Sequence, residues 1–377
     1  MDFPTLEQLK ARTTRKWTVY DEDIIPLWIA ESDFPTAPAV KANITRMVEQ
    51  EAFGYTPASS DLPEALADFY QQRYGWRPDP TKVRPVPDVV RGMVLAVQHF
   101  TRPDSEVIVP VPAYPPFNEL PEAAGRGKVE IGSEGGIDLA EVAGAFKAGA
   151  GSILLANPNN PFGYVYDEDF LRGLVNIADK YGARVIVDEI HAPVVLDGDH
   201  VVAASISETA AEVCLTVTAT SKAWNIAGLK CAQMIFTNDA DMKTWSSLTG
   251  VSKDGTGTLG IFAAAACYRE GVEYLDEQID YLRDNLDWLM EALPAAVPGI
   301  RLVRPQATYL LWLDFSDTAI GELEQPAAWL RKNARVALNE GTTFGPGGEH
   351  HARLNFATSR ELLTEAVDRM AKAFAAA

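Results

Sequence analysis

Short runs of β-branched residues alternate with helix-like stretches between residues 80 and 236. Apolar runs of about four to eight residues, bounded by turn residues, are typical of buried strands, and strands separated by helical patterns indicate a parallel sheet. The predicted strands are residues 106–110, 152–156, 184–188, 215–218 and 233–236. The pattern therefore predicts an α/β fold in which helices cover both faces of a mostly parallel sheet.

A different pattern follows the predicted sheet. Between Glu273 and Leu293, apolar side chains recur every three or four residues, which is typical of a long amphipathic helix. The elements predicted beyond it are strands at residues 302–303 and 309–313, a helix at residues 326–338 and a last helix from Arg360 onward. These elements indicate a smaller α+β domain at the C-terminal end of the chain.

The length of the chain favours more than one domain, because single hydrophobic cores stop growing at about 250–300 residues. The 377 residues are 47% hydrophobic and 23% charged, a composition typical of a globular enzyme. We expect an N-terminal segment that packs with the small domain (1–45), a large domain (46–280) and a small C-terminal domain (281–377).

Charge and cysteine content narrow the class of protein. With 33 basic and 52 acidic residues, the formal net charge is −19, and an acidic chain repels a phosphate backbone, so neither DNA nor RNA is an expected partner. The three cysteines form no CxxC pair, which favours the cytoplasm over a disulfide framework. The N-terminus lacks signal-peptide features and no apolar run reaches about 20 residues, so we expect neither export nor a membrane partner.

Three polar segments carry the candidate chemistry. They read ANPNNPFG at residues 156–163, VDEIH at residues 187–191 and ATSKAWNIAGLK at residues 219–230. Each lies at or after the carboxyl end of a predicted strand, where α/β sheets bind their ligands. In this order the segments resemble those of the fold-type I pyridoxal phosphate enzymes, which share an aminotransferase-like fold. The resemblance implies pyridoxal 5′-phosphate as the cofactor, bound by the large domain.

The resemblance also implies roles around the cofactor ring. Lys222 is the expected Schiff-base partner and proton carrier, a task that suits a desolvated lysine. Asp188 is expected to pair with the ring nitrogen, with His191 orienting its carboxylate. Asn160 is expected to reach the ring oxygen and Tyr114 to stack on the ring. Each residue also has an ordinary structural interpretation. Lys222 could be a surface lysine, Asp188 and Asn160 could belong to turns or a helix cap, and Tyr114 could be a packed core tyrosine.

We expect the cofactor phosphate at a helix start near residue 90. Backbone N–H groups at a helix N-terminus bind anions, and Gly92 and Met93 precede an apolar helical run. Ser221 and Lys230 would add a hydroxyl and a positive charge. Tyr55 resembles the residue that, in this family, reaches the phosphate of the other subunit, so the resemblance implies a homodimer with shared active sites. A plain turn is the alternative for Tyr55.

Arg353 is the candidate for binding the substrate. It follows a glycine-rich run at residues 341–348, and both features resemble the family. The resemblance implies that Arg353 holds the α-carboxylate of a small amino-acid substrate through a bidentate fork. Two other patterns lack the right context: GTGTLG at residues 255–260 follows no clear strand, and the pair at residues 350–351 lacks the spacing of a zinc helix. We therefore expect neither a dinucleotide loop nor a metal.

Within the family, the sequence most resembles the MalY/PatB branch of cystathionine β-lyases. The resemblance runs through nearly the whole chain and is carried by IPLWIAESDFP at residues 25–35, DEIH at 188–191, SKAWNIAGL at 221–229 and ATYLLWLDF at 307–315. It implies a carbon–sulfur lyase that converts L-cystathionine to homocysteine, pyruvate and ammonia by α,β-elimination, with Tyr114 assisting the departing thiolate.

Departures from that branch keep other functions open. The branch usually reads DMDFP where this chain has ESDFP, and PHNP where this chain has PNNP, a form more typical of aminotransferases. An aminotransferase using the same site is therefore the first alternative. A non-catalytic regulator that binds pyridoxal phosphate is the second, although no DNA-binding module is visible. A degenerate homologue is the third, and the presence of Lys222, Asp188 and Arg353 argues against it.

Overall fold

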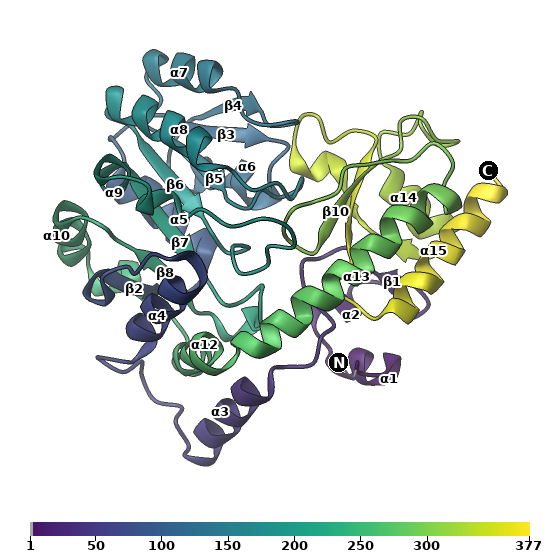
Figure 1. Ribbon diagram of the computed structural model, residues 1–377, viewed down its shortest axis with the longest axis horizontal. Helices are drawn as coiled ribbons and strands as arrows, with labels where there is room; N and C mark the ends of the chain where they lie inside the picture. The colour runs from purple at the N-terminus through teal and green to yellow at the C-terminus, as the bar shows by residue number, and fades with distance from the viewer. Residues whose placement is uncertain (1–2) are drawn as a thin grey trace.

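The computed structural model describes residues 3–377 and confirms the predicted α/β architecture (Figure 1). Its large sheet has the strand order β2-β8-β7-β6-β5-β3-β4. The strands are β2 (Val83–Val86), β3 (Val107–Val111), β4 (Lys128–Gly132), β5 (Ser152–Ala156), β6 (Arg184–Asp188), β7 (Cys214–Thr218) and β8 (Ala232–Ile235). The five strands β4, β3, β5, β6 and β7 pair in parallel. Strand β8 is antiparallel to both of its neighbours, β7 and β2.

Helices cover both faces of this sheet, as the alternating pattern predicts. Ile186 of β6 packs into the core on the side of α5 (Val89–Phe100), while Val185 and Val187 pack on the side of α8 (Glu168–Lys180). Successive strand residues point to opposite faces, so a strand that is buried on both sides must be apolar throughout. The other helices of this part are α4 (Leu62–Tyr74), α6 (Pro115–Ala123), α7 (Leu139–Ala148), α9 (Glu208–Val213), α10 (Asp239–Ser247), α11 (Gly250–Lys253) and α12 (Thr258–Glu270).

A second, antiparallel sheet forms the smaller C-terminal part, in the order β12-β13-β10-β9. Its strands are β9 (Arg301–Leu302), β10 (Leu310–Asp314), β12 (Asn339–Glu340) and β13 (His351–Asn355), and its helices are α13 (Val272–Ala296), α14 (Pro326–Asn333) and α15 (Arg360–Ala375). The long predicted helix is confirmed as α13, which runs along both parts in Figure 1. The helix predicted to Leu338 ends at Asn333, because Arg335 adopts a left-handed conformation (φ 56°) before a short strand.

The N-terminal segment pairs with the C-terminal part of the chain, in a separate two-stranded sheet. Strand β1 (Ile25–Pro26) pairs in parallel with β11 (Val336–Ala337), placing Ile25 opposite Val336. The remaining elements are α1 (Leu6–Ala11), α2 (Arg15–Thr18), α3 (Pro38–Glu49) and short 3₁₀ turns at Pro80–Lys82, Ala203–Ser205, Ala227–Leu229 and Gly341–Phe344. This pairing agrees with an N-terminal segment that packs on the small domain, and the domain boundaries stay predictions. Within residues 3–377, no helix is both long and apolar enough to cross a membrane.

Candidate active site

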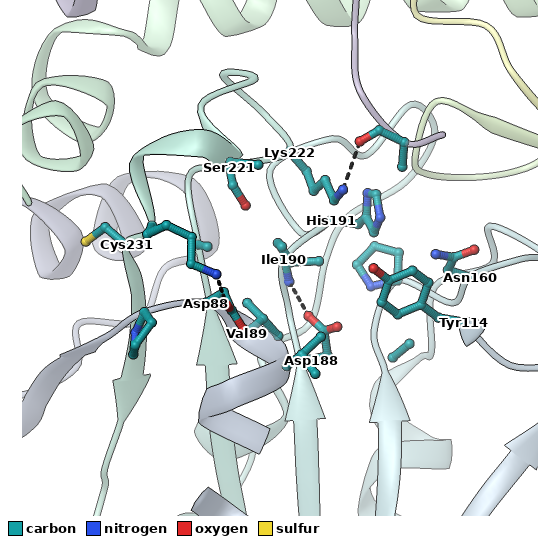
Figure 2. A pocket seen from close by; sticks show the side chains of 18 residues that line it. Asp88, Val89, Tyr114, Asn160, Asp188, Ile190, His191, Ser221, Lys222 and Cys231 are labelled. Atoms are coloured by element: carbon teal, nitrogen blue, oxygen red, sulfur yellow. Dashed lines mark hydrogen bonds and ion pairs between the residues drawn. The ribbon is translucent and has the colours of Figure 1, made fainter. Parts of the chain in front are cut away.

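A cavity of about 370 Å³ lies at the carboxyl ends of the central parallel strands. Ala156 ends β5, Asp188 ends β6 and Ala219 follows β7, and all three residues line the cavity. Figure 2 shows the side chains that surround it. Seven of the predicted site residues are among them: Tyr114, Asn160, Asp188, His191, Ser221, Lys222 and Lys230.

The Lys222 amine is held by a backbone oxygen. Its Nζ donates a hydrogen bond of 2.8 Å to the carbonyl of Ala30, which also accepts one of 3.1 Å from the Tyr309 hydroxyl. Burial, together with the nearby Arg353 cation, lowers the pKa of Lys222 to about 8, against the opposing attraction of Asp188. Lowering this pKa leaves a fraction of the amine neutral near physiological pH, as a nucleophile or a base requires.

The buried Asp188 carboxylate lines the cavity. Burial raises its pKa to about 7, although the Ile190 backbone N–H donates a hydrogen bond of 2.9 Å to its Oδ1. A carboxylate perturbed in this way gains from a cationic partner such as a protonated ring nitrogen.

His191 makes no hydrogen bond to that carboxylate within the described residues, so its predicted orienting role stays a prediction. Its Nδ1 has no hydrogen-bond partner among the described residues, and its ring packs edge-on to Tyr309 at 5.9 Å. Burial and the two nearby cations, Lys222 and Arg353, hold the pKa of His191 well below its usual value. A neutral imidazole therefore faces the cavity beside Lys222 (Figure 2).

Arg353 lies behind the cavity and reaches it through Asn160. Its Nη1 donates a 2.8 Å hydrogen bond to the Asn160 Oδ1 and its Nη2 a 3.4 Å bond to the carbonyl of Trp28, while its guanidinium lies over Phe344. Burial lowers the pKa of Arg353 to about 10, so it stays protonated at neutral pH. Both of these hydrogen-bond acceptors are uncharged, and Nε has no partner within the described residues. A buried cation in this state is suited to an incoming carboxylate.

The predicted helix start near residue 90 is present, but Gly92 and Met93 lie inside the helix rather than at its first N–H groups. Helix α5 begins at Val89, because Asp88 caps it by accepting a 2.8 Å hydrogen bond from the Arg91 N–H, and Val89 and Val90 line the cavity. Gly92 already donates its N–H to the Asp88 carbonyl at 2.9 Å, and a Cβ on Gly92 would clash with Val217. Gly92 and the fully buried Met93 are thus packing residues here, and the accessible N–H groups lie one turn earlier.

Tyr55 lies outside the cavity, on the loop between α3 and α4. Its side chain is fully exposed, as are large parts of Phe53 and Val251. The loop is attached to the start of α12 and the residues just before it. The Thr56 hydroxyl donates to the Thr256 carbonyl (3.1 Å), and the Thr258 hydroxyl donates to the Gly54 carbonyl (3.0 Å). Tyr55 therefore contributes nothing to the cavity of its own chain.

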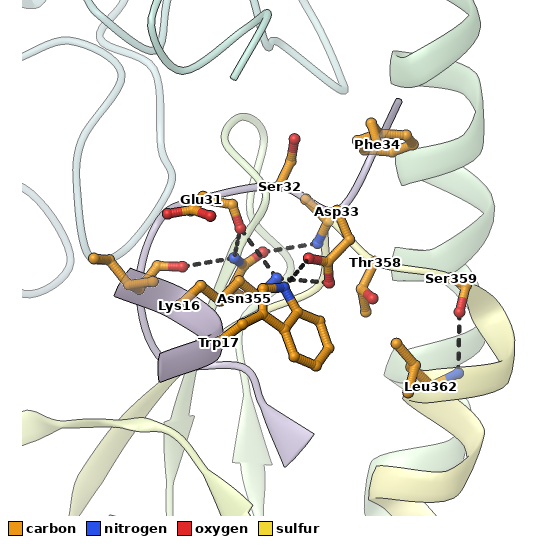
Figure 3. Close-up of polar contacts among 12 residues, drawn as sticks. Lys16, Trp17, Glu31, Ser32, Asp33, Phe34, Asn355, Thr358, Ser359 and Leu362 are labelled. Carbon is orange, nitrogen blue, oxygen red and sulfur yellow. Dashed lines mark hydrogen bonds and ion pairs between the residues drawn. The ribbon is translucent and has the colours of Figure 1, made fainter. Parts of the chain in front are cut away.

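A segment at residues 29–33, which we call the strap, contains the Ala30 carbonyl that accepts from Lys222. Figure 3 shows the polar contacts that hold this segment in place. The Asn355 amide donates to the carbonyls of Ile29 and Glu31, and Asn225 exchanges two hydrogen bonds with the Ser32 backbone. Below it, the Lys16 ammonium pairs with the Asp33 carboxylate at 2.7 Å, with both side chains buried. These contacts fix the Ala30 carbonyl that receives the Lys222 amine.

The residues present fit pyridoxal phosphate. Three buried polar atoms next to the site lack hydrogen-bond partners within residues 3–377: His191 Nδ1, Thr220 Oγ1 and Arg353 Nε. The groups that line the cavity correspond to the parts of the cofactor. The Lys222 amine suits its aldehyde, the Asp188 carboxylate its ring nitrogen, and the start of α5 with the Lys230 ammonium its phosphate. Arg353 remains for the substrate.

Sequence reasoning missed Asp88 and the Ala30 carbonyl. For Asp88, an aspartate before an apolar helical run was the available signal.

Known proteins are similar to this chain in both sequence and fold. A model of the Aminotransferase class I and II family matches residues 22–370. The chain is 52% identical to "Cystathionine beta-lyase" of Corynebacterium glutamicum, covering 98% of this chain and 99% of that one, and 31% identical to "Cystathionine beta-lyase PatB" of Bacillus subtilis at the same coverage. A crystal structure from Corynebacterium diphtheriae, provisionally named a PLP-dependent beta-cystathionase, superposes with a TM-score of 0.98 at 52% identity, covering 100% of this chain and 99% of that one.

Proposed function

The chain belongs to the class I and II aminotransferase family, and we propose from this premise that it is a carbon–sulfur β-lyase that cleaves L-cystathionine. The reaction takes up one water and yields homocysteine, pyruvate and ammonia. The observation that carries the proposal is one cavity in which Lys222 and Asp188 meet, with Arg353 behind it, in a chain 52% identical to a named cystathionine β-lyase.

The cofactor is pyridoxal 5′-phosphate, which when bound supplies a ring that stabilises the charge left on the substrate Cα after its proton is removed. The buried Asp188 carboxylate would hold the ring nitrogen, and Tyr114 lies beside Asn160 in the cavity wall (Figure 2). Ser221, Lys230 and the start of α5, which line the cavity, would hold the phosphate.

Lys222 moves the proton of the reaction. Its pKa of about 8 allows Nζ to accept the proton from the substrate Cα and to hold it at neutral pH. Arg353 fixes the substrate carboxylate, so that the Cα–H bond faces the amine rather than water.

Tyr114 serves as a proton donor in this proposal, not as a base. Burial raises its pKa above the ordinary value of 10, so its hydroxyl stays protonated at neutral pH. A protonated phenol can give its proton to the sulfur as the Cβ–S bond breaks, and the thiol of homocysteine then leaves uncharged.

We also propose a homodimer in which Tyr55 completes the partner's phosphate site. Tyr55 and Phe53 are exposed on a loop that is anchored close to α12, and an isolated chain gains nothing from exposing such aromatic side chains. Mixing Lys222→Ala chains with Tyr55→Ala chains tests this arrangement. Recovery of activity above that of either variant supports shared sites, because one site of each mixed dimer keeps both residues; no recovery contradicts them.

The function is tested by following pyruvate release from L-cystathionine with no 2-oxo acid added. Sustained release over many turnovers, with an equal amount of free thiol, is the expected result, and Lys222→Ala should abolish it. A single stoichiometric conversion that restarts only after a 2-oxo acid is supplied would instead establish the aminotransferase alternative. That alternative draws on the PNNP run at residues 158–161.

A further inference from the structure

An acidic side chain stands at the cationic end of the cavity. The Asp88 carboxylate forms an ion pair through Oδ2 with the Lys230 ammonium, and both residues line the cavity. Its other oxygen, Oδ1, accepts the hydrogen bond from the Arg91 N–H at the start of α5 (2.8 Å). One carboxylate therefore engages both the ammonium and the helix start.

A phosphate would use the same two partners, together with the Ser221 hydroxyl. A helix N-terminus with free N–H groups attracts anions, and a lysine adds a point charge. Arg91 supplies no replacement, because its guanidinium donates to the Ser252 carbonyl at 3.1 Å. Lys222 lies at the other end of the cavity, against the Ala30 carbonyl. A bound phosphate would thus share its local cation with a carboxylate already in place.

We propose that Asp88 is a built-in competitor for the cofactor phosphate, which lowers the affinity of the protein for pyridoxal phosphate. The inference rests on the proposed function for the identity of the ligand. The Asp88 charge offsets that of Lys230, and it repels a phosphate that approaches the start of α5. Because both side chains are about half exposed, solvent screens the effect to a modest size.

The Asp88→Asn variant tests this inference. Asparagine caps helices about as well as aspartate, so the variant removes the charge and keeps the start of α5. We expect the dissociation constant for pyridoxal phosphate, measured by titrating the apoprotein at low ionic strength, to fall by about two- to fivefold. The gain should shrink as salt is added. Binding of unphosphorylated pyridoxal should stay unchanged, because that ligand lacks the group with which Asp88 competes.

A matched control is Asp167→Asn, which removes the charge of the N-cap of α8, where Asp167 accepts from the Phe170 N–H at 2.8 Å. It should leave both affinities unchanged. Unchanged or weaker binding of pyridoxal phosphate by Asp88→Asn would overturn the inference, and so would an equal gain for pyridoxal. These outcomes leave the proposed function standing, whereas a wild-type protein that bound no pyridoxal phosphate would overturn both.

Discussion

Removing the charge of Asp33 should destabilise the protein strongly. The Asp33 carboxylate pairs with Lys16 Nζ at 2.7 Å, and the two side chains are 1% and 0% exposed. The same ammonium donates to the Glu31 carbonyl at 3.1 Å, and the Trp17 indole donates to Asp33 Oδ1 at 3.1 Å. Asp33→Asn keeps the volume and an oxygen acceptor but leaves Lys16 as a buried cation without a counter-charge.

The magnitude follows from the burial of both partners. Breaking a buried ion pair from one side costs about 3–5 kcal/mol, because the remaining charge stays desolvated and unpaired. An exposed pair costs less than about 1 kcal/mol. Glu168 and Arg172 form such a pair on the surface of α8, with side chains 57% and 45% exposed, so Glu168→Gln is a matched control.

Urea unfolding at fixed protein concentration, followed by tryptophan fluorescence, measures both effects. We expect Asp33→Asn to lower the free energy of unfolding by about 3–5 kcal/mol. The double variant Lys16→Met with Asp33→Asn should recover most of this loss, since it removes both charges. A loss for Asp33→Asn no larger than that for Glu168→Gln would refute the reasoning, and so would a double variant that is less stable than the single one.

Three further predictions concern the cavity. Because the pKa of Lys222 is lowered to about 8, the fraction of neutral amine falls about tenfold for each pH unit below that value. The rate of pyridoxal phosphate uptake by the apoprotein, followed by absorbance, should therefore rise toward pH 8 and then level off. A flat profile would contradict this prediction. Asp188→Asn keeps the shape of the site but removes its charge, so kcat for pyruvate release should fall by about 10²-fold or more; a kcat near that of the wild type would exclude the assigned role. Arg353→Lys loses the bidentate fork, so KM for L-cystathionine should rise by about 10- to 100-fold with a smaller change in kcat, and the reverse split would argue against carboxylate binding.

The interior of the large sheet could be predicted from sequence, and its edges could not. Strands β5 and β6 are buried on both faces, and each was predicted at the residues where it occurs. The edge strands β2 and β4 were missed. Strand β2 contains Pro85, which cannot donate to a ladder, and β4 exposes Lys128 and Gly132. Edge positions tolerate such residues because one side of the strand has no partner, and the apolar signal is lost with them.

In the site, the residues that could be predicted are those set by local sequence, and the ones that were missed depend on long-range contacts. Asp188 and Lys222 could be placed at strand ends from their neighbours in the chain, because the fold brings those ends together. The Ala30 carbonyl could not, since it acts through its backbone and meets Lys222 across 192 positions. Tyr309 likewise reaches that carbonyl from a distant strand. Tertiary contacts of this kind depend on packing that no local pattern records.

Two lysines, the buried Lys16 and the partly buried Lys222, show how a charge that stabilises the fold differs from one available to a ligand. Lys16 is enclosed by Asp33 and by a carbonyl, so its charge is matched and its task is to fix the strap. Lys222 has only the Ala30 carbonyl as a hydrogen-bond partner within residues 3–377, and Arg353 meets an amide and a carbonyl oxygen. Fully matched polar groups stabilise a fold, whereas under-matched ones cost stability and persist where a ligand will complete them. Burial alone would rank Lys16 first, but the missing partners favour the cavity around Lys222 as the ligand site that we propose.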